Sequence, residues 1–139
     1  MAVAGDGVVE RFFAHLTARA WDALGDVLVE DVERVGPFGD RVMGRSRYLD
    51  FLRGLVPDDY GNHVHRVTYG EDGTSAFARV TEHLVYPHGT HHLEEVYAFE
   101  LDEHGLIARL EVYWQTPHAD PGGFESATGD ERDMGAAGG

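Results

Sequence analysis

In the first part of the chain, apolar residues recur three and four positions apart, as along one face of an α-helix. This spacing predicts a first helix from residue 8 with Asp6 as its cap, and a short second helix at residues 21–28. A third helix is expected from a cap at Ser46 to a stop at residues 54–57. The apolar positions of the three helices are Val8, Val9, Phe12, Phe13 and Leu16, then Trp21, Leu24 and Leu28, then Tyr48, Leu49, Phe51, Leu52 and Leu55.

Beyond the third helix, apolar and polar residues alternate, which is typical of half-buried β-strands. The predicted strands are residues 63–69, 75–86, 91–101 and 106–115, with a shorter strand at residues 31–35 that GPFGD ends. Helices followed by consecutive strands predict an α+β fold, a curved antiparallel sheet wrapped over the N-terminal helices. Such a cone-shaped arrangement leaves a hollow that suits a small molecule.

Composition narrows the class of protein. The chain has 139 residues, enough for one domain, and its formal net charge of -14 argues against nucleic-acid and membrane partners. It has no cysteine, and its N-terminus lacks the basic region of a signal peptide, so we expect a cytoplasmic protein. We expect a flexible segment at residues 1–7, one domain at residues 8–116 with a central apolar pocket, and a disordered acidic tail at residues 117–139.

The stretch TEHLVYPHGTHHLEEVY, residues 81–97, holds four of the chain's nine histidines and three of its glutamates. If residues 87–90 form the connection of a hairpin, Glu82 lies directly opposite Glu95 and Val80 opposite Tyr97, all on the more apolar face. Two carboxyl groups side by side on such a face tend to share one proton, which makes an acid/base pair. We therefore name Glu82, Glu95 and Tyr97 as candidate catalytic residues. The alternative is a slipped register or a sheet edge at which both carboxylates reach water.

The histidines give weaker evidence for a metal or catalytic site than the glutamates do. His88, His91 and His92 lie in or beside the turn, and neighbouring residues of a strand point to opposite faces, so we expect no metal site. No dinucleotide or phosphate-loop motif occurs, and we expect no cofactor. His63 and His65 share one face of a strand; they are catalytic candidates if that face points inward, and solvent-exposed otherwise.

Three stretches together resemble a known superfamily. They are RFFAHL with AWDALGDVLVEDV at residues 11–32, VGPFGDRVMGRSRYLDFLRGL at residues 35–55, and FELDEHGLIARLEVYW at residues 99–114. The chain resembles the nuclear transport factor 2-like fold, and within it the ketosteroid isomerases and SnoaL-like polyketide cyclases. This resemblance implies a homodimer and a pocket lined by apolar side chains. Those we expect to bind substrate are Phe12, Tyr48, Phe51, Leu52, Val80, Leu84, Phe99, Leu110, Val112 and Trp114.

The resemblance also excludes one mechanism. Ketosteroid isomerases carry a catalytic aspartate immediately before Pro-Phe-Gly, where this chain has Gly36. Their oxyanion-hole tyrosine corresponds to Phe12, its supporting tyrosines to Leu28 and Leu52, and the second oxyanion acid to Tyr97. We therefore do not expect steroid isomerisation by that machinery.

Three functions fit the sequence. The first is a cofactor-independent isomerase or cyclase acting by general acid/base catalysis on a bulky apolar metabolite such as a polyketide. The second is an epoxide hydrolase, hydratase or dehydratase, which needs an arginine beside the acids; the predicted register points Arg79 away from them. The third is a non-catalytic ligand-binding or dimerisation domain.

Overall fold

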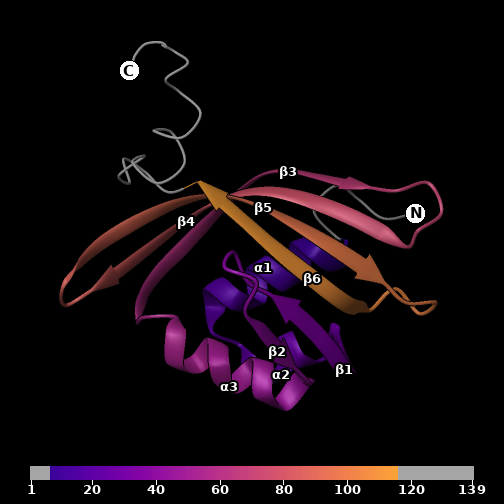
Figure 1. Ribbon diagram of the computed structural model, residues 1–139, viewed down its shortest axis with the longest axis horizontal. Helices are drawn as coiled ribbons and strands as arrows, with labels where there is room; N and C mark the ends of the chain where they lie inside the picture. The colour runs from indigo at the N-terminus through magenta and orange to yellow at the C-terminus, as the bar shows by residue number, and fades with distance from the viewer. Residues whose placement is uncertain (1–6, 116–139) are drawn as a thin grey trace, which may run out of the picture.

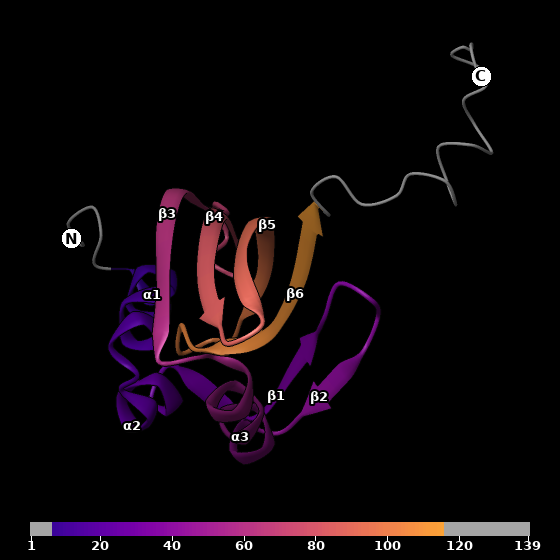
Figure 2. The same cartoon turned by 90° about the vertical axis from the view of Figure 1, so that its left-hand side faces the viewer.

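The computed structural model describes residues 7–115, which form an arched sheet with three helices on one side of it (Figures 1 and 2). The helices are α1 (Val8–Ala18), α2 (Trp21–Gly25) and α3 (Arg45–Leu55). The strands are β1 (Leu28–Val35), β2 (Arg41–Met43), β3 (Asp59–Tyr69), β4 (Ser75–Tyr86), β5 (Gly89–Leu101) and β6 (Ile107–Gln115). The predicted tail at residues 117–139 lies outside the described residues, and so does the predicted flexible N-terminus apart from Gly7.

The first and third helices form where the spacing predicts them, whereas the second ends at Gly25, and Leu28, predicted to belong to it, begins β1. Neither predicted cap is used. The N-cap of α1 is Gly7 rather than Asp6, and the hydroxyl of Tyr69 on β3 accepts a hydrogen bond of 3.1 Å from the Val9 N–H. The N-cap of α3 is Gly44, whose φ of 96° favours glycine, so Ser46 lies inside the helix. Within residues 7–115, no helix is long and apolar enough to cross a bilayer.

The sheet has six strands in the order β2-β1-β6-β5-β4-β3. The four long strands form an antiparallel meander, while β1 pairs with β6 in parallel and with β2 in antiparallel orientation. The predicted α+β class and curved sheet are confirmed, but the sheet is mixed and not wholly antiparallel. The alternation of apolar residues did not predict β2, because three residues are too few to show a period.

The hairpin of β4 and β5 has a different register from the one predicted. Its connection is Pro87-His88, closed by the pair Tyr86–Gly89, so Glu82 faces Leu93 and Glu95 faces Val80. Proline at the first turn position presets the required φ, and Gly89 has a φ of 154°, which favours glycine. The predicted pairing is wrong by two residues. A shift of two leaves each side chain on its predicted face, and the two glutamates become diagonal neighbours.

The core lies between the concave face of the sheet and the helices. Four of its aromatic rings come from α1 and β5 and pack against one another. Two of the contacts are edge to face: between ring centroids, Phe12 lies 5.7 Å from Phe99, and Phe13 lies 5.0 Å from Tyr97. Phe12, Phe13 and Phe99 are all buried, and Tyr97 is only 6% exposed. This cluster holds the Tyr97 ring in one place, with its hydroxyl directed toward Glu82.

Candidate active site

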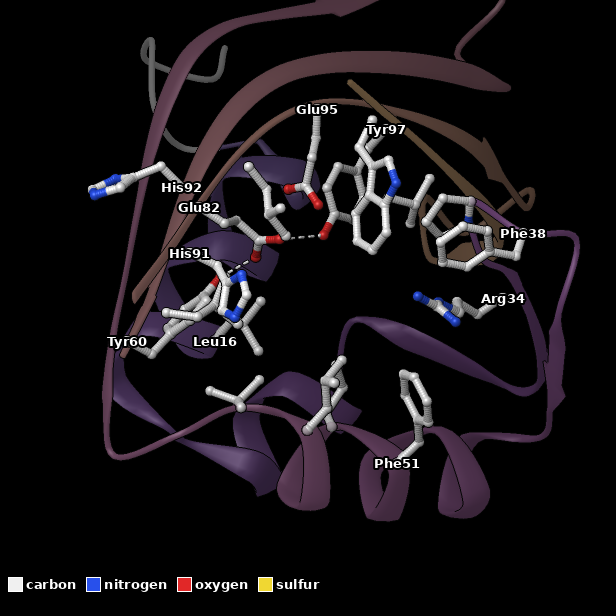
Figure 3. A pocket seen from close by; sticks show the side chains of 18 of the residues that line it. Leu16, Arg34, Phe38, Phe51, Tyr60, Glu82, His91, His92, Glu95 and Tyr97 are labelled. Carbon is white, nitrogen blue, oxygen red and sulfur yellow. Dashed lines mark hydrogen bonds between the residues drawn. The ribbon is translucent and has the colours of Figure 1, made fainter. Parts of the chain in front are cut away.

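A cavity of about 940 Å³ opens on the concave side of the sheet (Figure 3). Its walls come from β3, β4, β5 and β6 on one side and from α3 with the β1–β2 connection on the other. Most of the lining is apolar or aromatic, and the carboxylate and arginine side chains that reach it gather at two places. One place is the Glu82–Glu95 pair, and the other is Arg34 with Asp40.

Glu82 is 7% exposed and accepts hydrogen bonds from two tyrosines. The Tyr97 hydroxyl donates to its Oε1 at 3.1 Å, and the Tyr60 hydroxyl of β3 donates to its Oε2. The Asn62 amide donates in turn to the Tyr60 oxygen at 3.1 Å and fixes that ring. Burial, followed by the charge of Glu82, raises the pKa of both tyrosines, so both keep their protons. Two O–H donors stabilise a negative charge on the Glu82 carboxyl group.

The environment of the Glu95 carboxyl group differs from that of Glu82. It is 4% exposed, and its Oε1 has no hydrogen-bond partner among the described residues. Burial is the first cause that raises the pKa of Glu95 far above its ordinary value of 4.5, and the neighbouring Glu82 is the next. Both effects favour the protonated form of Glu95.

The two carboxyl groups therefore differ in their surroundings, as a base and an acid in one reaction would. Their environments differ because both tyrosine hydroxyls donate to Glu82 and neither donates to Glu95. Such a difference between two neighbouring carboxyl groups is an arrangement that acid/base chemistry can use. The inward orientation of the pair was predicted, and the structure brings Tyr97 to it as well.

Arg34 is a cavity residue that the sequence interpretation missed. It is 8% exposed, its Nη1 donates to Asp40 at 2.9 Å, and its guanidinium lies 4.7 Å from the centroid of the Phe51 ring. A Cβ at Gly36 would come within 2.6 Å of Arg34 Nη1 and closer still to the Asp40 carboxylate. The Arg34–Asp40 pair therefore fills the space that a side chain at Gly36 would need, where the ketosteroid isomerases carry their aspartate.

The expected substrate-binding residues divide into two groups. Six of them line the cavity: Tyr48, Phe51, Leu52, Leu84, Val112 and Trp114. Four do not, because they are buried in the core between the helices and the sheet: Phe12, Val80, Phe99 and Leu110. For these four, an inward direction means burial in the core, since a curved sheet shares its concave face between the helix and the cavity.

His63 and His65 do not reach the cavity. Both are exposed, and their rings lie 4.5 Å apart on the outer face, where His65 Nε2 is 2.7 Å from the Thr81 hydroxyl. His91 and His92 border the cavity at the hairpin tip. In residues 7–115, no three histidine and carboxylate side chains are arranged to hold a metal ion.

Some of the missed residues carry a signal that the sequence contains. Val32 and Arg34 are two residues apart on one strand and therefore share a face, so a buried Val32 places Arg34 on the inward face. Tyr60 and Asn62 are likewise two residues apart on one strand, but the predicted strand begins only at residue 63. Because β3 starts at Asp59, its first inward residues belong to the site.

Comparisons with known proteins agree with this fold. The SnoaL-like domain family matches residues 9–110, and the chain belongs to this family. A candidate ketosteroid isomerase from Kribbella flavida is 29% identical, with a TM-score of 0.70 over 82% of this chain and 79% of its own. A candidate polyketide cyclase from Xanthomonas campestris is 27% identical, with a TM-score of 0.68 over 78% and 87%.

The fold itself is the nuclear transport factor 2-like fold. A protein of that fold from Cytophaga hutchinsonii, whose function is unknown, superposes with a TM-score of 0.66 at 19% identity, over 87% of this chain and 93% of its own. No curated protein matches the chain. The predicted superfamily and branch are thus confirmed.

Proposed function

We propose that the protein is a cofactor-independent isomerase or cyclase that acts on a bulky apolar ketone by general acid/base catalysis. The observation that carries this proposal is the buried Glu82–Glu95 pair, with two tyrosine donors on one carboxyl group and none on the other. A cavity of about 940 Å³ with mostly apolar walls suits a substrate of several fused or folded rings. The solved relatives described as candidate isomerase and candidate cyclase support the same reaction class.

In the proposed first step, the Glu82 carboxylate removes a proton from a carbon next to the substrate carbonyl. The C–H electron pair moves into the carbonyl to form an enolate, and Glu82 becomes protonated. The enolate oxygen is stabilised by the proton of neutral Glu95, in a site from which apolar walls exclude water. Tyr97, one of the candidate catalytic residues, donates its hydrogen bond to Glu82, and its role in this step is to orient the base.

The second step differs between the two reaction types. In an isomerisation of a ketone that carries a β,γ double bond, the enolate is a dienolate; Glu95 gives its proton to the γ-carbon, and the proton on Glu82 then passes to Glu95. In an aldol cyclisation, the enolate carbon attacks a second carbonyl of the same molecule, and Glu95 protonates the new alkoxide. Both routes begin with proton removal by Glu82, so one assay detects either.

The test is deuterium uptake from D₂O into apolar ketones such as 2-decalone and cyclododecanone, followed by mass spectrometry. Positioned acid/base groups typically accelerate such a step by about 10² to 10⁴-fold, and we expect uptake at least about 100-fold above buffer. Glu82→Gln should remove this acceleration, because an amide cannot take the proton. Glu94→Gln is the matched control, since Glu94 is an exposed neighbour on the outer face that accepts a bond from Thr81.

Uptake no faster than in buffer, or equal uptake in Glu82→Gln and wild type, would contradict the proposal. In that case the cavity would belong to a protein that binds ligands without transforming them.

A second candidate function rests on Arg34. Hydration or epoxide opening needs a cation near the carboxyl groups, and Arg79 points outward as the sequence predicted. Arg34 supplies that cation from β1, and its charge acts on Glu95, whose pKa it lowers against the larger effect of burial. Release of a diol from an apolar epoxide such as styrene oxide, with no deuterium uptake into ketones, would favour this function.

The homodimer also stays a proposal. Phe77, Val96 and Tyr113 are 52%, 41% and 56% exposed on the outer face of β4, β5 and β6. Three apolar side chains on adjacent strands suit an interface between two sheets. Sedimentation equilibrium of wild type and Val96→Glu tests this, with a dimer expected for the first and a monomer for the second.

A further inference from the structure

Arg34 lies across the cavity from the carboxyl pair. Figure 3 shows its guanidinium pointing into the hollow from the side of Phe38 and Phe51, while Glu82 and Glu95 project from the facing wall. Among the described residues that line the cavity, Arg34 is the one lysine or arginine. A charged group that is 8% exposed and aimed at an apolar hollow loses much of its hydration, so its position calls for a function.

The bonding of Arg34 leaves most of its donors unused. A guanidinium has five N–H groups, and the described residues accept only the one bond from Nη1 to Asp40. Asp40 also lines the cavity, and its side chain, 49% exposed, keeps contact with solvent while it holds Arg34. The Phe51 ring, 4.7 Å from the guanidinium, holds the plane of that group.

The surrounding backbone keeps this arrangement in place. Gly36 leaves room for the Arg34–Asp40 pair, since a Cβ there would lie 2.6 Å from Arg34 Nη1. The Gly36 N–H donates to the Asp40 carbonyl at 2.7 Å, which closes the loop that carries both partners. One N–H group of the Arg34 guanidinium is therefore hydrogen-bonded to Asp40, and the remaining N–H groups are left for a ligand.

We propose that Arg34 anchors a carboxylate of the substrate, so that the cavity takes an apolar carboxylic acid. Two parallel N–H···O bonds between a guanidinium and a carboxylate have the geometry that the untied edge of Arg34 can provide. The acid end would bind at Arg34, and the apolar body would extend toward Glu82 and Glu95. The inference rests on the proposed function only for the position of the reacting carbon.

The test compares two fluorescent probes of the same shape, 4-(1-pyrenyl)butyrate and 4-(1-pyrenyl)butanol, titrated against the full chain. We expect the carboxylate to bind at least tenfold more tightly than the alcohol in the wild type. In Arg34→Met the ratio of the two dissociation constants should fall to about one. Arg79→Met removes the same charge from the outer face and should keep the wild-type ratio.

Equal affinities in the wild type, no binding of either probe, or a preference that survives in Arg34→Met would overturn the inference. Arg34→Lys gives a second readout: it keeps the charge but loses the fork, and an intermediate ratio is expected. Glu82→Gln separates this inference from the proposed function, because it should lose deuterium uptake and keep the carboxylate preference. Loss of that preference in Glu82→Gln would count against a separate anchor at Arg34.

Discussion

Substitution of Glu95 gives the strongest test of the electrostatics of the site, because burial of its carboxyl group disfavours the ionised form and so lowers the unfolding free energy at neutral pH. Glu95→Gln keeps the shape of the side chain and removes the ionisable proton, so it resembles the protonated acid. A native pKa above the unfolded value of 4.5 means that the native state binds more protons than the unfolded chain once the pH exceeds 4.5. Stability from this group is therefore complete below about pH 4.5 and falls as the pH rises toward the native pKa.

The size of the effect follows from the same linkage. Each pH unit between the two pKa values changes the unfolding free energy by about 1.4 kcal/mol. Between pH 5 and pH 7 the wild type should lose about 2.5 kcal/mol relative to Glu95→Gln, because the unfolded glutamate is already partly ionised at pH 5. The variant should thus be the more stable protein at pH 7, and its advantage should grow with pH.

Urea unfolding followed by circular dichroism at pH 5, 6 and 7 measures this difference. Glu94→Gln is again the control, since an exposed side chain of the same type should change the unfolding free energy by less than about 0.5 kcal/mol at each pH. A difference between wild type and Glu95→Gln that does not change with pH would refute the reasoning. It would mean that Glu95 ionises as it does in water.

Three further predictions concern other parts of the site. Tyr97→Phe removes a donor to a charged acceptor, worth about 1.5–3 kcal/mol, so deuterium uptake should fall about 10- to 100-fold; an unchanged rate would show that the hydroxyl does not orient the base. Phe12→Ala should lower the unfolding free energy by about 3–5 kcal/mol in urea melts, and a cost below about 1 kcal/mol would contradict its place in the core. His63→Ala and His65→Ala should each leave uptake and stability unchanged, because both side chains are exposed on the outer face; a tenfold slower rate in either would make it catalytic.

Much of the fold could be predicted because its periods are long and uninterrupted. The helical spacing around Phe12 and the alternation along residues 75–86 each extend over several turns or residue pairs, and the structure keeps both. The register of the hairpin could not be derived in the same way, since it depends on which residues occupy one short turn. Pro87 and Gly89 decided it, and the error of two residues left the predicted inward face intact.

The acidic half of the site was visible in the sequence, and the basic half was not. Glu82, Glu95 and Tyr97 belong to one hairpin, so local alternation was enough to bring them together. Arg34 reaches the same cavity from β1, which joins the sheet through a parallel pairing with β6. No local pattern shows that two segments so far apart in the chain will face each other.

The central claim is that Glu82 and Glu95 share one proton at neutral pH, and ¹³C NMR of the glutamate carboxyl carbons tests it most directly. The protein is labelled at these carbons and titrated from pH 3 to pH 9, and Glu95→Gln assigns the resonance. The chemical shift then reports the protonation state of the Glu95 carboxyl group directly. We expect the Glu95 carboxyl carbon to keep the chemical shift of the protonated acid through pH 7, because burial and Glu82 raise its pKa. A Glu95 resonance that titrates near pH 4.3, as an ordinary glutamate does, would contradict the account.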